Sequence, residues 1–132
     1  MLFRSDLDRA MLGRHDLMAS DLTVTEVISS VARRWRAGAL SAETALRLQR
    51  TVMGHFDEGL YRRVDLTSEV HRQAERFLLT LRAVAVRAAD ALHLALAASS
   101  GAATILTYDA RLAGAARAVG IQIGRASCRE RV

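Results

Sequence analysis

The chain has 132 residues, 51% of them hydrophobic, which suits one compact domain with a core of its own. Its single cysteine excludes an internal disulfide framework and a cysteine-based zinc site. The formal net charge is +5, and all 19 basic residues are arginine, which suits a polyanionic partner such as RNA, DNA or an acidic protein. An all-arginine chain is equally expected from GC-rich coding DNA with ordinary solvated arginines, so charge alone leaves both explanations open.

Two further features concern location. No stretch reaches the ~18 to 20 consecutive apolar residues that a membrane-spanning helix needs. The N-terminus carries Arg4, Asp6 and Asp8 and lacks the apolar segment of a secretory signal. We therefore expect a cytoplasmic protein without a membrane partner.

Hydrophobic periodicity and capping residues predict helices that alternate with short strands. The predicted helices cover 5–13, 23–37, 41–59, 67–81, 88–100 and 109–120, and the predicted strands cover 15–20, 60–66, 103–107 and 121–123. Within the helix over 23–37, Thr23 and Glu26 have the spacing of a capping box. The alternation without long hairpins predicts an α/β fold, a three-layer α/β/α sandwich with a short parallel sheet.

The domain boundary is predicted near the C-terminus. Residues 1–123 show no repeat or linker and are expected to form one domain. Residues 124–132, GRASCRERV, are arginine-rich and continue no pattern. We interpret them as a non-native tail and assign no role to Cys128.

Asp90 is the strongest candidate for a functional residue. It lies in the most apolar helix predicted, among Ala88, Ala89, Ala91 and Leu92. A carboxylate in such surroundings is expected at an exposed helix end, beside a partner, or at a metal ion. The non-functional explanation is pairing with a neighbour such as Arg87 or His93, or exposure in the first helical turn.

Two further acids also begin helices. Asp109 follows the strand over 103–107, and in parallel α/β sheets functional sites lie beyond the carboxyl ends of strands. An ordinary N-cap would explain Asp109 equally well, and half of a capping box would explain Glu26. Thr107 is placed to support Asp109 or a bound water. Three acids at three helix starts favour a shared metal site more than any one of them does.

Other catalytic motifs are missing from the sequence. It has no G-x-x-x-x-G-K-[ST] phosphate loop, no G-x-G-x-x-G and no G-x-S-x-G. The histidines, at positions 15, 55, 71 and 93, lack the spacing of metal ligands.

Two segments resemble the PIN-domain ribonucleases, in particular the VapC-type toxins of bacterial toxin–antitoxin pairs. They are LTVTEVISSVARR, from Leu22, and RAADALHLALAASSGAATILTYDARLAGAARAVGI, from Arg87. The resemblance covers about residues 5–123. It implies a parallel-sheet α/β/α sandwich, cleavage of RNA with Mg²⁺ or Mn²⁺, a homodimer, and inhibition by a cognate antitoxin.

The resemblance also implies roles for individual residues. The acids that match the family's metal site are Glu26, Asp90 and Asp109. They would hold Mg²⁺ or Mn²⁺ through oxygen ligands. Arg87 and Arg111, which are close to these acids in sequence, are candidates for holding the RNA backbone.

One departure from the family concerns the first strand. The family begins with a hydrophobic central strand ending in an aspartate, whereas this chain begins with MLFRSDLDRA, which aligns with the following helix. We therefore expect that strand and its metal ligand to be missing and the metal affinity to be reduced. The alternatives to an active endoribonuclease are an inactive remnant and a module that binds RNA or antitoxin without catalysis.

Overall fold

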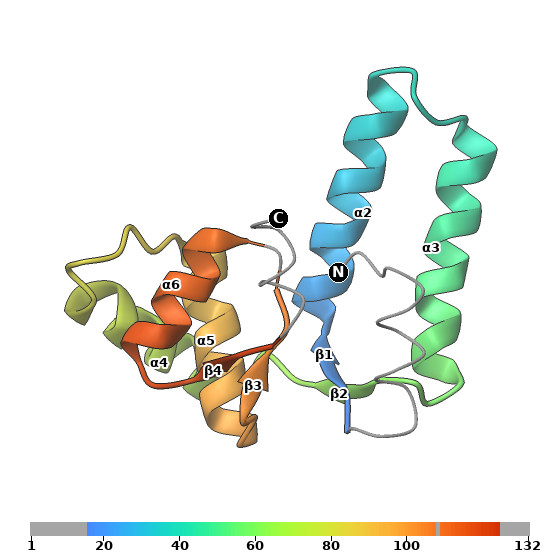
Figure 1. Ribbon diagram of the computed structural model, residues 1–132. Helices are drawn as coiled ribbons and strands as arrows, with labels where there is room; N and C mark the ends of the chain where they lie inside the picture. Colours follow the sequence, from blue (N-terminus) through green and yellow to red (C-terminus); the bar gives the residue numbers. More distant parts are fainter. Residues whose placement is uncertain (1–15, 108, 125–132) are drawn as a thin grey trace. The chain divides into compact units, whose positions relative to one another are not determined.

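The computed structural model describes residues 16–107 and 109–124 of the chain (Figure 1). They belong to two compact units, Met1–Asp65 and Leu66–Val132, called here the N-terminal and C-terminal units. The predicted helix over 5–13 and the predicted tail beyond Gly124 lie outside the described residues. The described elements are β1 (Met18–Ser20), α2 (Asp21–Arg36), α3 (Ala42–Asp57), β2 (Arg62–Val64), α4 (Ser68–Thr80), α5 (Ala88–Ser100), β3 (Thr104–Ile105), α6 (Ala110–Ala118) and β4 (Gln122–Ile123).

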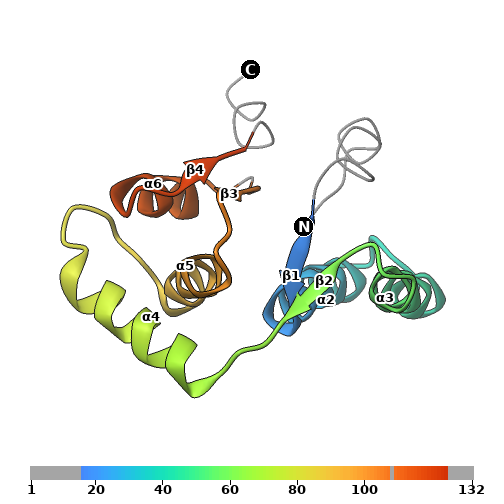
Figure 2. The ribbon, with the colours of Figure 1, turned by 90° about the horizontal axis from the view of Figure 1, so that it is seen from below.

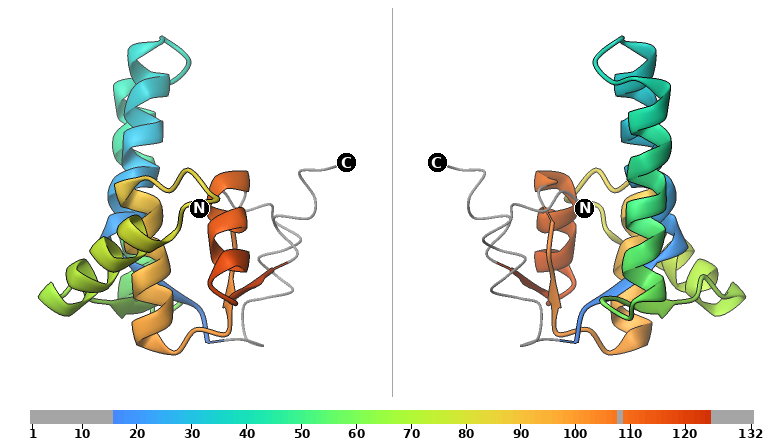
Figure 3. Two further views of the ribbon diagram at one scale, coloured as in Figure 1. Left: turned by 90° about the vertical axis from the view of Figure 1, so that its left-hand side faces the viewer. Right: turned by 90° about the vertical axis from the view of Figure 1, so that its right-hand side faces the viewer.

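The N-terminal unit combines a short parallel strand pair with a helical hairpin. Strand β1 pairs with β2, with Met18 opposite Arg62 and Ser20 opposite Val64. Helices α2 and α3 run side by side in opposite directions, as Figures 1 and 3 show. Gly38, with φ of 79°, allows the tight connection between them, because glycine has no Cβ to oppose a positive φ.

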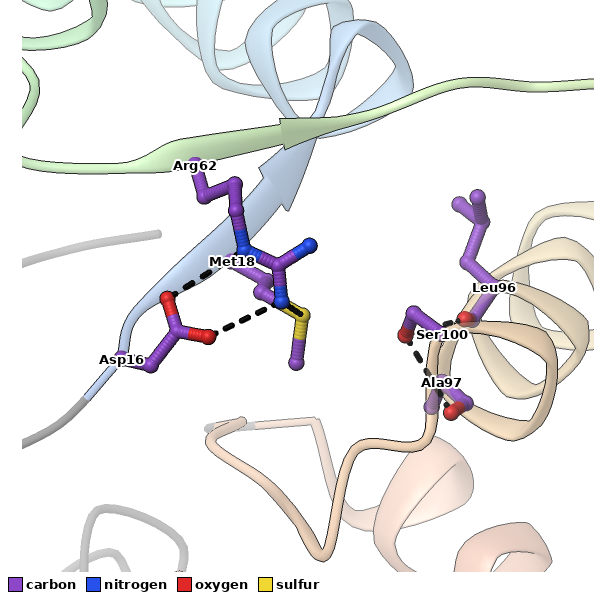
Figure 4. A network of polar contacts seen from close by, with 6 residues as sticks. All are labelled: Asp16, Met18, Arg62, Leu96, Ala97 and Ser100. Atoms are coloured by element: carbon purple, nitrogen blue, oxygen red, sulfur yellow. Dashed lines mark hydrogen bonds and ion pairs between the residues drawn. The ribbon is translucent and has the colours of Figure 1, made fainter.

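An ion pair joins Asp16, which precedes β1, to Arg62 on β2. Arg62 Nη2 lies 2.9 Å from Asp16 Oδ2 (Figure 4). The hydrogen bond from Arg62 holds the pKa of Asp16 below its ordinary value of 3.8. A carboxyl group with a lowered pKa stabilises the fold at pH values above its ordinary pKa. This stabilisation is lost as the pH falls through the lowered pKa of the folded state. Both side chains are more than half exposed, so solvent screening keeps this contribution small.

The C-terminal unit is built around α5. Helix α5 packs against α4 and α6, and β3 pairs in parallel with β4, with Ile105 opposite Ile123 (Figure 2). The core cluster contains Leu94, Leu112, Ala115 and Ala116, with partly buried apolar side chains around it. The alanines on α5 and α6 have small side chains, so the two helices can pack against each other. These short helices thereby form an apolar interior.

Most predicted elements are confirmed, and so is the parallel direction of the strand pairs. Ser41, Thr67 and Asp109 cap α3, α4 and α6 by accepting hydrogen bonds from backbone N–H groups, as their side chains predict. Gly101 ends α5 in the left-handed conformation, with φ of 72°. Within the two described ranges, no helix is long and apolar enough to cross a membrane.

Two local predictions are wrong. Helix α2 begins at Asp21 and its N-cap is Ser20, whose Oγ accepts the Thr23 N–H at 3.4 Å, so Thr23 and Glu26 do not form the predicted capping box. Strand β3 covers only Thr104–Ile105 and is partly exposed, in contrast to the buried strand predicted over 103–107. Its pairing is limited by β4, which is equally short.

Candidate active site

Asp90 is a buried carboxylate near the beginning of α5. It is the third residue of the helix and is 7% exposed. Its Oδ2 accepts a hydrogen bond from the backbone N–H of Arg87 at 3.0 Å. This bond satisfies a donor at the N-terminus of the helix, where the guanidinium of Arg87 cannot serve as a cap because it has no acceptor atom. The predicted pairing with Arg87 therefore exists, but through the backbone.

Asp109 links β3 to α6 and is exposed. Its Oδ1 accepts the backbone N–H groups of Arg111 at 2.8 Å and Leu112 at 3.4 Å. Its own N–H donates to Thr107 Oγ1 at 3.0 Å. Thr107 thus supports Asp109 directly, and the carboxylate is held at the N-terminus of α6, after the carboxyl end of β3.

The capping role of Asp109 can be separated from any role of its charge. We expect Asp109→Ala to lower the free energy of unfolding by about 0.5–2 kcal/mol, because two N–H groups lose their acceptor. Asp109→Asn should cost much less, because asparagine keeps an acceptor oxygen. Urea denaturation followed by circular dichroism measures both. Equal losses for the two variants would contradict the capping role.

Glu26 belongs to the N-terminal unit and is exposed on α2. The unpaired N–H groups of a helix start lie in its first turn. Because α2 begins at Asp21, Glu26 lies beyond that turn. The capping explanation for this glutamate is therefore removed, and its proposed role as a metal ligand stays a prediction.

The three predicted metal ligands are thus found in two separate units. Asp90 and Asp109 lie in the C-terminal unit and Glu26 in the N-terminal one. Over residues 16–107 and 109–124, no three His, Cys, Asp or Glu side chains come close enough to hold a metal ion. Carboxylates are the donors that Mg²⁺ and Mn²⁺ prefer, so the type of donor fits, and their convergence on one ion stays a prediction.

The arginines predicted to hold RNA lie beside these acids. Arg87 is the exposed N-cap residue of α5, and Arg111 is a half-buried residue in the first turn of α6. None of the ion pairs found in the described part of the chain involves either residue. A further group of arginines, Arg33, Arg34 and Arg36, surrounds Trp35 at the end of α2.

Comparison with known proteins identifies the family. Residues 3–118 match the model of the PIN domain family, whereas no curated protein and no solved structure matches the chain. PIN domains are generally nucleases, usually depend on divalent metal ions and commonly bind RNA. Helices alternating with short parallel strands are consistent with the three-layer α/β/α fold of this family. Because the match covers most of its length, this chain belongs to the PIN domain family.

Proposed function

We propose that this chain is a metal-dependent endoribonuclease that hydrolyses RNA phosphodiester bonds and acts as the toxin of a VapC-type toxin–antitoxin pair. The observation that carries the proposal is Asp90, a buried carboxylate in the otherwise apolar helix α5 of a PIN domain. Burial of a carboxylate is costly unless it serves a partner, and the partner found in the described part of the chain is the backbone N–H of Arg87.

In this proposal, Glu26, Asp90 and Asp109 hold one or two Mg²⁺ or Mn²⁺ ions. When bound, the metal lowers the pKa of a water molecule and stabilises charge on the leaving oxygen. The Arg87 N–H fixes the orientation of the Asp90 carboxylate. The Thr107 hydroxyl fixes the backbone that carries Asp109.

Arg87 and Arg111 hold the RNA in the same proposal. A guanidinium group offers a rigid fork of donors that matches two phosphate oxygens at once. One arginine lies at the start of α5 and the other at the start of α6, each next to a proposed metal ligand in its helix. Both could therefore orient a phosphodiester toward the acids.

The proposal extends to partners and boundaries. The partners are an RNA substrate, an antitoxin protein and a second copy of the chain in a homodimer, and the setting is cytoplasmic. Exposed leucines on α3 and α4, among them Leu46 and Leu79, support protein partners. The catalytic domain in this proposal covers residues 1–123, followed by a tail over 124–132.

A cleavage assay with end-labelled single-stranded RNA tests the proposal. We expect cleavage with Mn²⁺ or Mg²⁺ and none with EDTA, because in this proposal the bound cation would supply the activated water and stabilise the leaving oxygen. Restoring Mn²⁺ after chelation should restore cleavage. Cleavage that persists in EDTA after repeated chelation would contradict metal dependence.

A second candidate is a module that binds RNA or antitoxin without catalysis. The observation in its favour is that no three metal-ligating side chains lie together within residues 16–107 and 109–124. RNA binding that is indifferent to Mg²⁺ and Mn²⁺, with intact RNA recovered afterwards, would favour it. A non-cooperative thermal melt would instead favour an inactive remnant.

A further inference from the structure

The far end of the α2–α3 hairpin carries an unusual group of side chains. This group, called here the hairpin tip, consists of Arg33, Arg34, Trp35, Arg36, Arg47 and Arg50. We propose that the hairpin tip binds single-stranded RNA, with the arginines on phosphates and a base stacked on Trp35. The inference rests on the proposed function in taking RNA as the substrate, and it adds a binding site separate from the acids.

The hairpin places the arginines in the last turn of α2 and Arg47 in the half nearest the connecting turn, and Arg50 lies about one turn further along α3. Helix α2 ends at Arg36 and α3 begins at Ala42, and the two helices lie side by side (Figure 1). Both views in Figure 3 show the turn that joins them. Arg33 and Arg47 are therefore at similar distances from the connecting turn. Between Arg33 and Arg50 the sequence has only one acid, Glu43, so the positive charge is concentrated.

Within residues 16–107 and 109–124, no ion pair involves the arginines of the hairpin tip. Arg33 Nη2 contacts Ser30 Oγ at 3.3 Å and Arg47 Nη2 contacts Thr44 Oγ1 at 3.5 Å, and both partners are neutral hydroxyls. By contrast, Arg72 on α4 pairs with Glu75 at 2.8 Å. Guanidinium groups without carboxylate partners are available for phosphates.

Trp35 supplies the apolar part of the site. Its side chain is 49% exposed, which is unusual for a tryptophan in a small domain. Successive helical residues are about 100° apart, so Arg34 and Arg36 flank it on either side. An aromatic face between cations is the arrangement that proteins use to stack single-stranded bases while holding the backbone.

A purely structural explanation covers only part of this group. Arginines in the last turn of α2 interact favourably with the negative end of the helix dipole. Arg47 and Arg50 lie in the interior of α3, where no such dipole effect acts. The dipole also gives no reason for the exposure of Trp35.

The hairpin also relates this site to one proposed metal ligand. Glu26 and Arg33 are seven residues apart on α2, which is about two helical turns, so they lie on the same face. Trp35 is nine residues from Glu26, about two and a half turns, so it lies on the opposite face of α2. Of these two residues of the hairpin tip, Arg33 and not Trp35 shares the face of Glu26.

The intrinsic fluorescence of the protein tests the inference directly, since Trp35 is the only tryptophan. Single-stranded oligoadenylate is titrated into the full chain in EDTA, where the proposed nuclease is inactive. We expect quenching of Trp35, because a base stacks on its ring. The salt dependence of binding gives a second measurement. The binding constant falls as salt rises, and the double variant Arg33→Gln/Arg34→Gln should make this dependence less steep. The slope of log K against log[salt] should decrease in magnitude by about 1.4, or ~0.7 per lost phosphate contact.

The matched control is Arg72→Gln/Arg76→Gln, which removes the same charge from the exposed surface of α4. We expect it to keep the quenching and most of the salt slope. Equal loss of slope in both double variants, or no quenching in the parent chain, would overturn the inference. Circular dichroism checks that each variant keeps its helices.

Two further outcomes are informative. Quenching by an acidic peptide such as oligoglutamate, with none by RNA, would overturn the inference in favour of a protein partner. Quenching without any RNA cleavage in Mn²⁺ would support the inference while contradicting the proposed nuclease. RNA cleavage without quenching of Trp35 would support the proposed nuclease and overturn the inference. The two proposals can therefore be tested separately.

Discussion

Asp90→Asn is expected to abolish metal-dependent RNA cleavage while the chain still folds. Asparagine keeps an oxygen that can accept the Arg87 N–H, so the start of α5 is preserved. It removes the negative charge that the proposed metal requires. Loss of a group that merely supports a metal ligand costs about 10- to 100-fold, and loss of a ligand should cost more. The measurement is the initial rate of cleavage of end-labelled RNA in Mn²⁺.

The control for this variant is Asp65→Asn, the same substitution at an exposed aspartate. It should cleave at the parent rate. A second measurement avoids reliance on activity: Mn²⁺ should raise the melting temperature of the parent chain and of Asp65→Asn, but much less that of Asp90→Asn. Undiminished cleavage by Asp90→Asn would exclude this residue from the site.

Leu94→Ala is expected to have the largest effect on stability. Leu94 on α5 is 0% exposed and belongs to the core cluster between α5 and α6. Truncation removes buried methyl groups and leaves a cavity, which is expected to cost about 3 kcal/mol. Small domains are stable by only about 5–15 kcal/mol, so much of the margin would disappear. Urea denaturation followed by circular dichroism measures the loss.

Leu79→Ala is the matched control. Leu79 on α4 is 85% exposed, so the same truncation should change the free energy of unfolding by no more than about 0.5 kcal/mol. Similar costs for the two substitutions would show that α5 does not form the core of the C-terminal unit. A loss of stability at position 79 that appears only at high protein concentration would instead indicate that this leucine is buried in an assembly.

Local signals in the sequence predicted most of the helices. Ser41, Thr67 and Asp109 each precede an amphipathic segment, and each accepts an N–H from the helix it begins. Gly101 ends α5 because its positive φ is easily adopted only by glycine. These features depend on a few adjacent residues, so the sequence contains all the necessary information.

Features that depend on distant residues were predicted less well. The choice of Ser20 over Thr23 as the N-cap of α2 accompanies the pairing of Ser20 with Val64, far away in the sequence. The lengths of β3 and β4 limit each other in the same way. Local patterns identify a strand but do not specify its partner or how far the pairing extends.

In the candidate site, too, the features that depend on adjacent residues were predictable and those that depend on distant residues were not. The unusual position of Asp90 was evident from its apolar neighbours, and its burial excludes the explanation by exposure in the first helical turn. The association of Thr107 with Asp109 was also evident, because the two residues are close in sequence. Convergence of Glu26 with the two aspartates requires the two units to be placed together, and no local pattern encodes that arrangement.

Ser20 belongs to two elements at once. It is the last residue of β1 and the N-cap of α2, and it is buried. Side chains alternate between the two faces of a strand, so a slip of β1 by one residue against β2 would turn the Ser20 hydroxyl to the opposite face. Because α2 begins at the next residue, the start of the helix would have to turn with the strand. Correct strand alignment therefore also sets the position of the hairpin, and a mispaired form of this unit displaces both elements.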